Sequence, residues 1–466
     1  MNNNDLKRED VVNILKKQDE FFYTHRTKSL DFRVNQLKKL KTVIKKNEEK
    51  IFDALYQDLR KNRVESYATE VGFIYSSIDE TIKNLKKWSK DKKVKTPIFL
   101  QPAKSIIRYE PYGKVLIIGP FNYPFQLIIE PLIGVIAAGN CAVIKPSELS
   151  PNVSRVITEI INDTFDENYI ISVEGGVETN TSLLSGNFDY IFFTGSVAVG
   201  KIVMEAAAKN LTPVTLELGG KSPVIVDRNT NIKATARKLV WGKTVNVGQT
   251  CIAPDYLYVH ENIKDELIEE MKKAVEELYG NNIEKSESYG RIINERHFNR
   301  LRAILDEDKD KIIYGGHHNI NDKYISPTFI EITSRDVACM REELFGPILP
   351  IMTYNELDKV IDDINNHDKP LALYLFTEDK KIQKKVIEST SSGGVSINDT
   401  ILHVSNPNLP FGGVGPAGMG SYHGENSFRT FSHKRSILKK SNKINITPHY
   451  PPFNNKKLKM LKICFD

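Results

Sequence analysis

The chain has 466 residues, more than one hydrophobic core normally organises, so two or three domains packed into one body are expected. Hydrophobic residues make up 40% of it and charged residues 27%, which is typical of a soluble globular protein and excludes a disordered or fibrous chain. The formal charge of +6 is a small difference between 65 basic and 59 acidic residues, so no nucleic-acid partner is predicted.

Residues 5–95 are predicted to be helical. Apolar residues recur there at helical spacing, as in the series Ile74, Ile78, Ile82 and Leu85. Two lysine-rich runs, 38–50 and 83–95, fall in the same segment. Apolar residues such as Leu37 and Ile44 mark the opposite face of the first run, so both runs are interpreted as solvated helix faces rather than as a binding surface.

The N-terminus and the cysteines indicate a reducing compartment. The first ten residues, MNNNDLKRED, contain no apolar core that could serve as a secretory signal. The cysteines are scattered without a C-x-x-C pair or metal-ligand spacing, which argues against a zinc site and against a disulfide framework. They are Cys141, Cys251, Cys339 and Cys464. We therefore expect a cytoplasmic protein without a bound metal.

From residue 113 onward, short apolar strands alternate with helices. The strand runs are KVLIIG, CAVIK, YIISVEGG, YIFFTGS, VTLELGG and PVIVD. This alternation is typical of parallel βαβ units, so we predict a doubly wound, Rossmann-like NAD(P)-binding domain from residues 1–96 and 113–218. One part of it, 115–144, is long and apolar enough to span a bilayer. Its glycines and prolines break it into strand, helix and strand, which favours a buried unit.

A second alternating series predicts a second α/β domain, the catalytic domain, over residues 219–418. Its strand runs include LALYLF and GGVSIN, with helices such as 262–279 and 357–365 between the strands. Two segments fit neither domain, because 97–112 has strand-like residues and no helix, and 428–440 is similar. We expect these two segments to leave the body as a small β oligomerisation element, which predicts a homodimer.

Cys251 is a candidate nucleophile. It lies in the sequence VNVGQTCIAPD, where Gly248 and Gln249 precede the thiol. A glycine-bearing turn can expose a thiol and offer backbone N–H groups to a developing anion, and a nucleophilic thiol also needs a lowered pKa. Taken alone, a single cysteine is more often buried and inert, which is how we interpret Cys141 inside the run CAVIK.

Glu217 and Asn122 are predicted to lie at strand ends. Glu217 is followed by Gly219 and Gly220, so its carboxylate should project from a strand end, where ligands collect in α/β sheets. It could be a general base with a raised pKa, or a surface or helix-capping charge. Asn122 lies in the turn after KVLIIG and is a candidate oxyanion donor, although asparagine is also common in turns for conformational reasons.

The signals for cofactor binding are weak one by one. No G-x-G-x-x-G follows a predicted strand, but YIFFTGSVAVGK places Gly195, Ser196 and Gly200 between a strand and a helix. A helix N-terminus there could face a pyrophosphate. Lys145 and Glu148, in CAVIKPSE, follow another strand and could hold ribose hydroxyls, or they could be ordinary surface charges.

Together, seven stretches resemble motifs of the aldehyde dehydrogenase superfamily, over about residues 20–435. In chain order they are GPFNYPF, KPSE, FTGSVAVG, LELGGKSP, GQTCIAPD, EELFGP and PFGGVGPAGMGSYHG. KPSELS, CIAPDY and GMGSYHG are similar to the class 3 branch, which includes the fatty aldehyde dehydrogenases. One departure is Phe121, where the family usually has Trp or a similar residue, and there an aromatic side chain is retained.

The resemblance implies a role for individual residues. Cys251 is the nucleophile, Glu217 is the base, and the Asn122 amide holds the oxyanion together with the Cys251 backbone N–H. Ribose contacts are implied for Lys145 and Glu148, a phosphate turn for Gly195, Ser196 and Gly200, and a grip on the nicotinamide end for Glu343 and Phe345. The implied cofactor is NAD, with NADP as the other candidate.

The implied reaction oxidises an aldehyde to a carboxylic acid. Thiolate attack gives an oxyanion held by two N–H donors, its collapse expels hydride to the nicotinamide, and water activated by Glu217 hydrolyses the thioester. The alternative is an acylating relative that passes the thioester to coenzyme A, or an acyl-phosphate reductase, on the same fold. Such relatives typically lack the glutamate, so Glu217 favours hydrolysis. A purely structural or binding role is disfavoured because Cys251, Glu217 and Asn122 are all present.

The resemblance also bears on the substrate, while the C-terminal tail leaves two readings open. The tunnel residues expected from it are Tyr123, Thr250, Ile401, Leu402 and Phe411. This mostly apolar set favours medium to long aliphatic or aromatic aldehydes over charged semialdehydes. Residues 441–466 are predicted to be a tail that ends in a short, basic, amphipathic stretch. Such an end could touch an anionic membrane but is too short to span one, and we favour a tail packed on the protein or loose in solvent.

Overall fold

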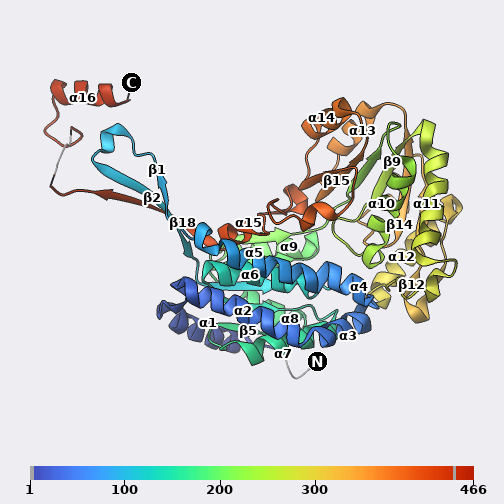
Figure 1. The fold of residues 1–466 in the computed structure, drawn as a ribbon, viewed down its shortest axis with the longest axis horizontal. Coiled ribbons are helices and arrows are strands. Elements are labelled where there is room, and N and C mark those ends of the chain that lie inside the picture. Colours follow the sequence, from blue (N-terminus) through green and yellow to red (C-terminus); the bar gives the residue numbers. More distant parts are fainter. Residues whose placement is uncertain (1–4, 444–447, 466) are drawn as a thin grey trace.

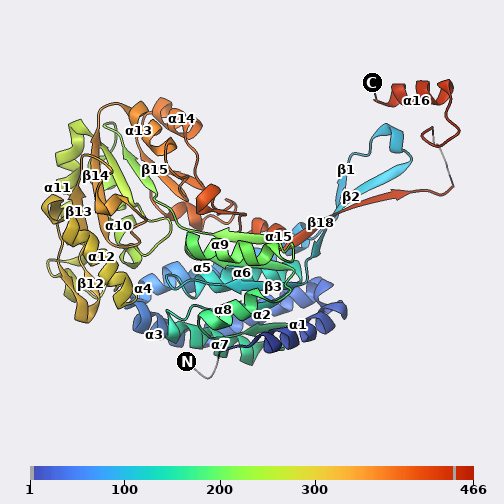
Figure 2. The ribbon, with the colours of Figure 1, turned by 180° about the vertical axis from the view of Figure 1, so that it is seen from behind.

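The chain folds into two α/β bodies and a thin arm that extends away from them (Figure 1). The computed structural model describes residues 5–443 and 448–465. The positions outside these residues are 1–4, 444–447 and 466, together with the side chain of Cys464, so the parts of the predicted first domain and tail that fall on them are not described. Seen from behind, the arm leaves the first body on the side away from the second body (Figure 2).

Helices make up most of the first ninety residues, as predicted. They are α1 (Arg8–Tyr23), α2 (Leu30–Lys46), α3 (Glu48–Leu59), α4 (Arg63–Ser66) and α5 (Gly72–Trp88), with a π-helical turn η2 (Tyr67–Val71) between the last two. The helical prediction is wrong beyond Trp88, because the strand β1 (Lys92–Val94) follows. The second lysine run therefore continues past the end of its helix. No apolar residue extends the helical spacing there, and β1 obtains its backbone hydrogen bonds by pairing with the next strand along the chain.

The first body is built around a six-stranded sheet in the order β17-β7-β6-β3-β4-β5. Its strands are β3 (Lys114–Ile118), β4 (Cys141–Lys145), β5 (Ile170–Ser172), β6 (Tyr190–Thr194), β7 (Val214–Glu217) and β17 (Gly418–Met419). All neighbours are parallel except β17 and β7. The chain returns from β5 to β6 on the other side of β3, so the strand order reverses between β3 and β6, which is where ligands bind in such sheets.

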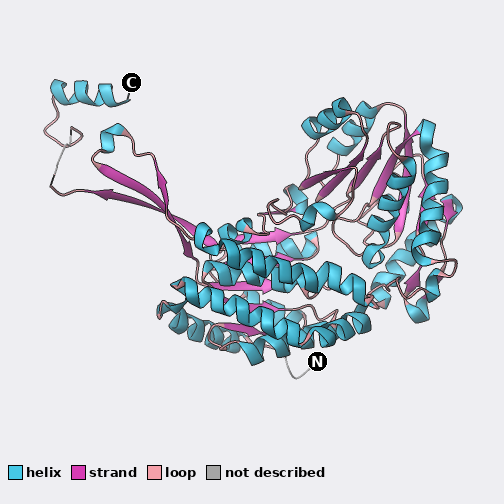
Figure 3. Cartoon of the chain, in the orientation of Figure 1, coloured by secondary structure: helices cyan, strands magenta, loops and turns pink. Residues whose placement is uncertain are grey.

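Helices cover both faces of this sheet (Figure 3). Those that follow its strands are α6 (Gln126–Ala138), α7 (Pro151–Thr164), α8 (Val177–Leu184) and α9 (Val197–Ala208). Residues of β3 alternate between two cores, since Val115 packs in the cluster with α2, α5 and α6, while Leu116 packs in the cluster with α1 and α8. The apolar segment 115–144 is β3, α6 and β4, as predicted, and α6 ends at Gly139 with φ 92°. None of the described helices combines the length and apolar character needed to cross a membrane.

The second body contains a seven-stranded sheet in the order β10-β13-β14-β9-β8-β15-β16, parallel except at β10. Its strands are β8 (Pro223–Val226), β9 (Tyr256–His260), β10 (Ile312–Tyr314), β13 (Thr328–Glu331), β14 (Ile348–Tyr354), β15 (Ala372–Phe376) and β16 (Gly394–Ile397). Its helices are α10 (Ile232–Thr244), α11 (Lys264–Tyr279), α12 (Glu295–Glu307), α13 (Leu357–Asn365) and α14 (Lys380–Ser389), and a small hairpin joins β11 (His318–Asn319) to β12 (Tyr324–Ile325). The prediction of two α/β units is confirmed.

The arm is a three-stranded antiparallel sheet in the order β1-β2-β18. It unites β2 (Ala103–Pro111) with β18 (Ser432–Lys440), the two segments in which the sequence has strand-like residues. The expectation of strands without helix needs correction in both segments. A 3-10 turn, η3 (Ile98–Leu100), precedes β2, and α15 (Glu425–Thr430) includes the first residues of 428–440. The terminal helix α16 (Asn455–Phe465) lies beside the tip of the arm, where Phe465 meets Phe99 with ring centroids 4.6 Å apart.

Candidate active site

Several predicted site residues lie at one edge of the first sheet. Asn122 follows the end of β3, Lys145 is the last residue of β4, Gly195 follows β6, and Glu217 is the last residue of β7. Parallel strands end at the same edge, so the loops that follow them gather there. The structure therefore brings together residues that are up to ninety-five positions apart in the sequence.

Cys251 lies after α10 and a 3-10 turn, η4 (Val245–Gly248), in the connection that leads to β9. Three consecutive residues in η4 have left-handed backbone conformations, with φ 50° at Asn246, 56° at Val247 and 73° at Gly248. Glycine is required at 248, because a Cβ there would lie 2.3 Å from the carbonyl oxygen of Gly346. A branched residue such as Val247 in this conformation costs about 1–3 kcal/mol, strain of the kind found at functional sites.

Gln249 anchors this loop. Its Nε2 donates to the Arg291 carbonyl oxygen at 3.0 Å, and its Oε1 accepts from the backbone N–H of Ile293 at 3.0 Å. The Gln249 carbonyl oxygen in turn accepts from Nδ2 of Asn122 at 3.0 Å. One hydrogen of the Asn122 amide is thus used to orient the group, and the second is available for an oxyanion.

The thiol of Cys251 has a raised pKa, which corrects the expectation of a lowered one. Burial is the largest cause, and the carboxylates of Glu343 and Glu217 raise the pKa further, while the backbone N–H groups of Cys251 and Ile252 lower it. The glycine-rich turn predicted exposure and N–H groups, but it gave no sign of the burial or of the two carboxylates that raise the pKa of the thiol.

Glu217 is buried, with 3% of its surface exposed, and neither of its carboxylate oxygens has a hydrogen-bond partner in the described part of the chain. Burial raises the pKa of Glu217 well above its ordinary value, because it disfavours the ionised form of the carboxyl. A buried, unpartnered carboxyl that raises the pKa of a thiol is a candidate general base, because strongly shifted groups cluster at functional sites.

Glu343 connects two of the predicted motifs. Its Oε2 would lie 2.0 Å from a Cβ at position 219, so only glycine at that position permits this approach. Burial raises the pKa of Glu343 to about 8, with Asp255 adding to the effect. Phe345 has a left-handed φ of 47°, and its ring meets that of Phe121 edge-on at 5.7 Å between centroids. Within residues 5–443 and 448–465 no group of His, Cys, Asp and Glu has the arrangement of a metal site.

The residues predicted for the phosphate turn have different roles. Ser196 caps α9, and its side chain accepts from the backbone N–H of Val199, which leaves the other N–H groups of the first turn for a ligand. Gly195 directly precedes the cap. Gly200 lies inside α9 and is buried, and a Cβ there would be 2.7 Å from the Leu218 side chain, so its role is close helix packing.

Lys145 and Glu148 form an ion pair with each other. Lys145 is 1% exposed and burial lowers its pKa, whereas Glu148 is partly exposed. An open helix N-terminus and this charged pair, both at the carboxyl edge of a doubly wound sheet, fit the phosphates and ribose hydroxyls of a dinucleotide.

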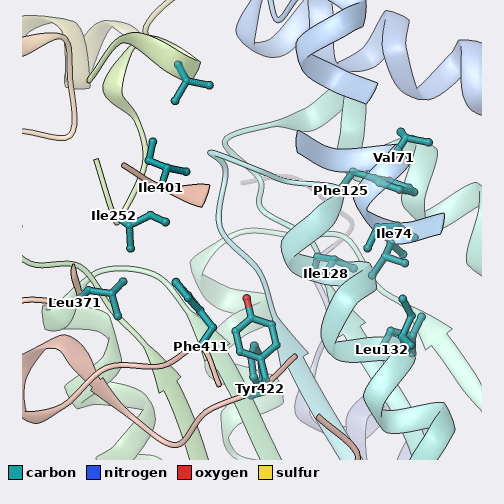
Figure 4. Packing of buried hydrophobic residues seen from close by; sticks show 14 of the residues in the cluster. Val71, Ile74, Phe125, Ile128, Leu132, Ile252, Leu371, Ile401, Phe411 and Tyr422 are labelled. Carbon is teal, nitrogen blue, oxygen red and sulfur yellow. The ribbon is translucent and has the colours of Figure 1, made fainter. Parts of the chain in front are cut away.

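Most of the residues predicted to line the substrate tunnel are buried. The hydroxyl groups of Tyr123 and Thr250 are hydrogen-bonded at 2.7 Å. Ile401 and Phe411 are each 8% exposed, and Figure 4 shows both in the same part of the core. Leu402 differs, since it is 50% exposed.

Sequence reasoning missed several buried charged residues beside the site. Lys61 and Glu70 form an ion pair, and the Lys243 ammonium is buried without a hydrogen-bond partner among the described residues. No motif marks them. Nine residues along a continuous α-helix would put Lys61 and Glu70 on opposite faces. They meet because α3 ends before Lys61 and the π-helical turn η2 contains Glu70.

Comparison with known proteins agrees with this geometry. The sequence model of the aldehyde dehydrogenase family matches residues 2–437. The chain is 54% identical over 445 residues to 4,4'-diaponeurosporen-aldehyde dehydrogenase of Staphylococcus aureus, covering 96% of the chain and 97% of that protein. It is 45% identical over 445 residues to the dimeric NADP-preferring aldehyde dehydrogenase of Rattus norvegicus, covering 95% and 98%. A solved structure of substrate-bound Staphylococcus aureus AldH has a TM-score of 0.96 and 53% identity, covering 98% of this chain and 99% of that one.

These matches extend over both α/β bodies and most of the arm. They confirm the resemblance inferred from the seven motifs, including its class 3 branch. The chain belongs to the aldehyde dehydrogenase family and is an NAD(P)-dependent aldehyde dehydrogenase.

Proposed function

We propose that Cys251 forms a covalent bond with the aldehyde and that Glu217 assists the hydrolysis that releases the acid. The observation that carries this proposal is the hydrogen bond that ties the Asn122 amide to the loop of Cys251, and it is supported by the unpartnered Glu217 carboxyl, which raises the pKa of the Cys251 thiol. A nucleophile, an oxyanion donor and a base are what acyl transfer through a thioester requires.

In the first half of the reaction, the deprotonated Cys251 sulfur adds to the aldehyde carbon and the carbonyl oxygen becomes an oxyanion. The second hydrogen of the Asn122 amide and the Cys251 backbone N–H are the donors available to it. Glu343 and Phe345 would hold the nicotinamide, which supplies a hydride acceptor when bound. Loss of the hydride leaves an acyl thioester on Cys251.

In the second half, the Glu217 carboxylate accepts a proton from water, and the oxygen of that water adds to the thioester carbon. The carbon–sulfur bond then breaks, which releases the acid and regenerates the thiolate. The unpartnered Glu217 carboxyl, which acts electrostatically on the Cys251 thiol, supports hydrolysis rather than transfer of the acyl group to coenzyme A or phosphate.

We assign medium to long aliphatic or aromatic aldehydes as substrates, because the buried positions Ile401 and Phe411 are apolar and Tyr123 is aromatic. The Staphylococcus aureus relative is named 4,4'-diaponeurosporen-aldehyde dehydrogenase. The test is NADH formation across linear aldehydes of rising length, benzaldehyde and a charged semialdehyde, with and without coenzyme A. We expect kcat/KM to rise with chain length and the product to be the free acid in both conditions. Preference for the semialdehyde, or an acyl-coenzyme A product, would contradict the proposal.

The preference between cofactors is expected to favour NAD. The Glu148 carboxylate can accept a hydrogen bond from a ribose 2′-hydroxyl and would repel a 2′-phosphate. The measurement is kcat/KM for NAD and for NADP, in the wild type and in Glu148→Gln. We expect the wild type to have a higher kcat/KM for NAD than for NADP. The difference should be smaller in Glu148→Gln, because the repulsion between the carboxylate and the 2′-phosphate is removed. A higher kcat/KM for NADP than for NAD in the wild type would contradict this expectation and would match the relative that is named NADP-preferring.

We further propose that the arm mediates a homodimer, with NAD(P) bound by residues 1–96 and 113–218 and catalysis organised by 219–418. The arm strand β18 is nine residues long and lies at the open edge of its sheet, which is a ready template for pairing. The rat relative is named as dimeric. Light scattering that gives the mass of one chain would contradict this assignment.

The tail is assigned as a soluble segment and the enzyme as cytoplasmic. Cys141 and Cys339 are buried free thiols, which suits a reducing compartment. The helix α16 contacts the arm through Phe465, while Lys457 donates to the carbonyl oxygens of Tyr450 and Pro452. Co-sedimentation with anionic liposomes that is lost on truncation at Tyr450 would overturn the soluble assignment.

A further inference from the structure

Lys61 and Glu70 form a buried ion pair beside the active site. Nζ of Lys61 lies 2.5 Å from Oε1 of Glu70, and the two side chains are 1% and 0% exposed. Removing two charges from water costs free energy, so a buried ion pair is weak evidence for a contribution to stability. Glu70 also lies in the π-helical turn η2, an irregularity that occurs frequently at functional sites. Both features therefore point to a role for the pair other than stability.

The pair holds the loop that carries Asn122. Lys61 Nζ donates to the Asn122 carbonyl oxygen at 3.2 Å and lies 4.2 Å from the centroid of the Tyr123 ring. The second carboxylate oxygen of Glu70 accepts from the backbone N–H groups of Phe125 at 2.9 Å and Gln126 at 3.1 Å. One end of this loop is therefore fixed by the ammonium and the other end by the carboxylate.

The same helical segment also reaches the loop before Cys251. Oε1 of Glu65 accepts from the backbone N–H of Asn246 at 2.9 Å. Nδ2 of Asn246 donates to the carbonyl oxygens of Asn122 at 2.8 Å and Gln249 at 3.1 Å. The Asn122 carbonyl oxygen thus accepts from both Lys61 and Asn246, and the two loops that form the oxyanion site are tied to each other and to residues 61–70.

We infer that Lys61 and Glu70 are positioning residues that hold the Asn122 amide at the correct distance from Cys251, an inference that rests on the proposed function. The pair acts through Asn122, because Lys61 and Glu70 contact the backbone of that loop and the Tyr123 ring. A donor moved by about 1 Å from the oxyanion lowers the rate about 100-fold. Loss of the hydrogen bond from Lys61 to the Asn122 carbonyl oxygen should therefore lower the rate of the chemical step.

The test is a double-mutant cycle between Lys61 and Asn122. Lys61→Met is expected to lower kcat/KM for the aldehyde about 100-fold, with KM for NAD unchanged. In the Asn122→Ala background the same substitution should add little, because the donor it positions is already absent. The control is Lys114→Met, which removes another buried lysine, paired with Asp19 at 2.6 Å at the start of β3, and should leave kcat/KM unchanged.

A second variant guards against misfolding. Lys61→Met combined with Glu70→Gln removes both charges, and the glutamine oxygen can still accept from the backbone N–H groups at the start of α6. We expect this double variant to unfold cooperatively at a temperature close to that of the wild type. Its kcat/KM should be lowered, and the reduction should be much smaller in the Asn122→Ala background.

The inference is overturned if the reductions in kcat/KM caused by Lys61→Met and by Asn122→Ala multiply when the two substitutions are combined. It is also overturned if Lys61→Met has the same kcat/KM as the wild type. The proposed function fails separately, if wild-type enzyme forms no acid from aldehyde or if Cys251→Ala still does. The two failures are therefore distinguishable.

Discussion

Replacing Cys251 by alanine is expected to lower aldehyde oxidation by at least about 10⁴-fold, because removal of a nucleophile abolishes the covalent path. The bond between sulfur and carbonyl carbon cannot form, and the buried Glu217 cannot substitute for it. Binding of NAD should persist, since the residues assigned to its ribose and phosphates lie at the ends of β4 and β6. The measurements are steady-state NADH formation and calorimetric titration with NAD.

The matched control for this variant is Cys141→Ala. Cys141 is a fully buried thiol at the start of β4, and burial raises its pKa to about 12. Its loss should leave kcat within about twofold, since removing one buried sulfur affects packing rather than chemistry. Substantial turnover by Cys251→Ala, or equal losses in both variants, would remove Cys251 from the role of nucleophile.

Replacing Glu217 by glutamine is expected to preserve hydride transfer and to slow deacylation by about 100-fold or more, the contribution of a general base. Rapid mixing should show a burst of NADH close to one equivalent per subunit, followed by slow turnover. The substitution changes the charge but hardly the size of a side chain that is 3% exposed, so the fold should be retained.

The pH dependence provides a second signature of Glu217. Burial raises the pKa of Glu217 well above its ordinary value, so the ionised base becomes more abundant as pH rises through that raised pKa. Wild-type deacylation should increase with pH over this range, and Glu217→Gln should lose that increase. The control is Glu130→Gln, another buried carboxyl, whose pKa burial raises to about 7 and which lies inside α6. A burst in the control, or unchanged steady-state turnover in Glu217→Gln, would contradict the base role.

The fold was predictable where hydrophobic periodicity is strong. The predicted helix 357–365 coincides with α13, and the predicted run CAVIK coincides with β4. The strand β1 could not be predicted, because all three of its residues are exposed and it is stabilised by pairing with residues 105–107, which lie 11 to 15 positions further along the chain. Pairing of this kind leaves no periodic signal in the local sequence.

The residues of the site also differ in how far the sequence points to them. Cys251, Glu217 and Asn122 could be proposed as site residues from the sequence, because each lies at or after the end of a recognisable strand or helix and in a motif of the family. The Lys61–Glu70 pair could not, because it depends on a break between α3 and α4 and on a π-helical turn, neither of which has a sequence signature. The raised pKa of the Cys251 thiol also escaped prediction, because it depends on burial and then on two carboxylates, Glu343 and Glu217, that are distant in the sequence.

The most direct test of the account is to trap the acyl group. Glu217→Gln enzyme mixed with NAD and a medium-chain aldehyde is quenched in acid after the burst, digested, and analysed by mass spectrometry. The account predicts that the peptide with Cys251 gains the mass of the acyl group in proportion to the NADH formed, and that those with Cys141 and Cys339 do not. A full NADH burst with an unmodified Cys251 peptide would contradict the central claim.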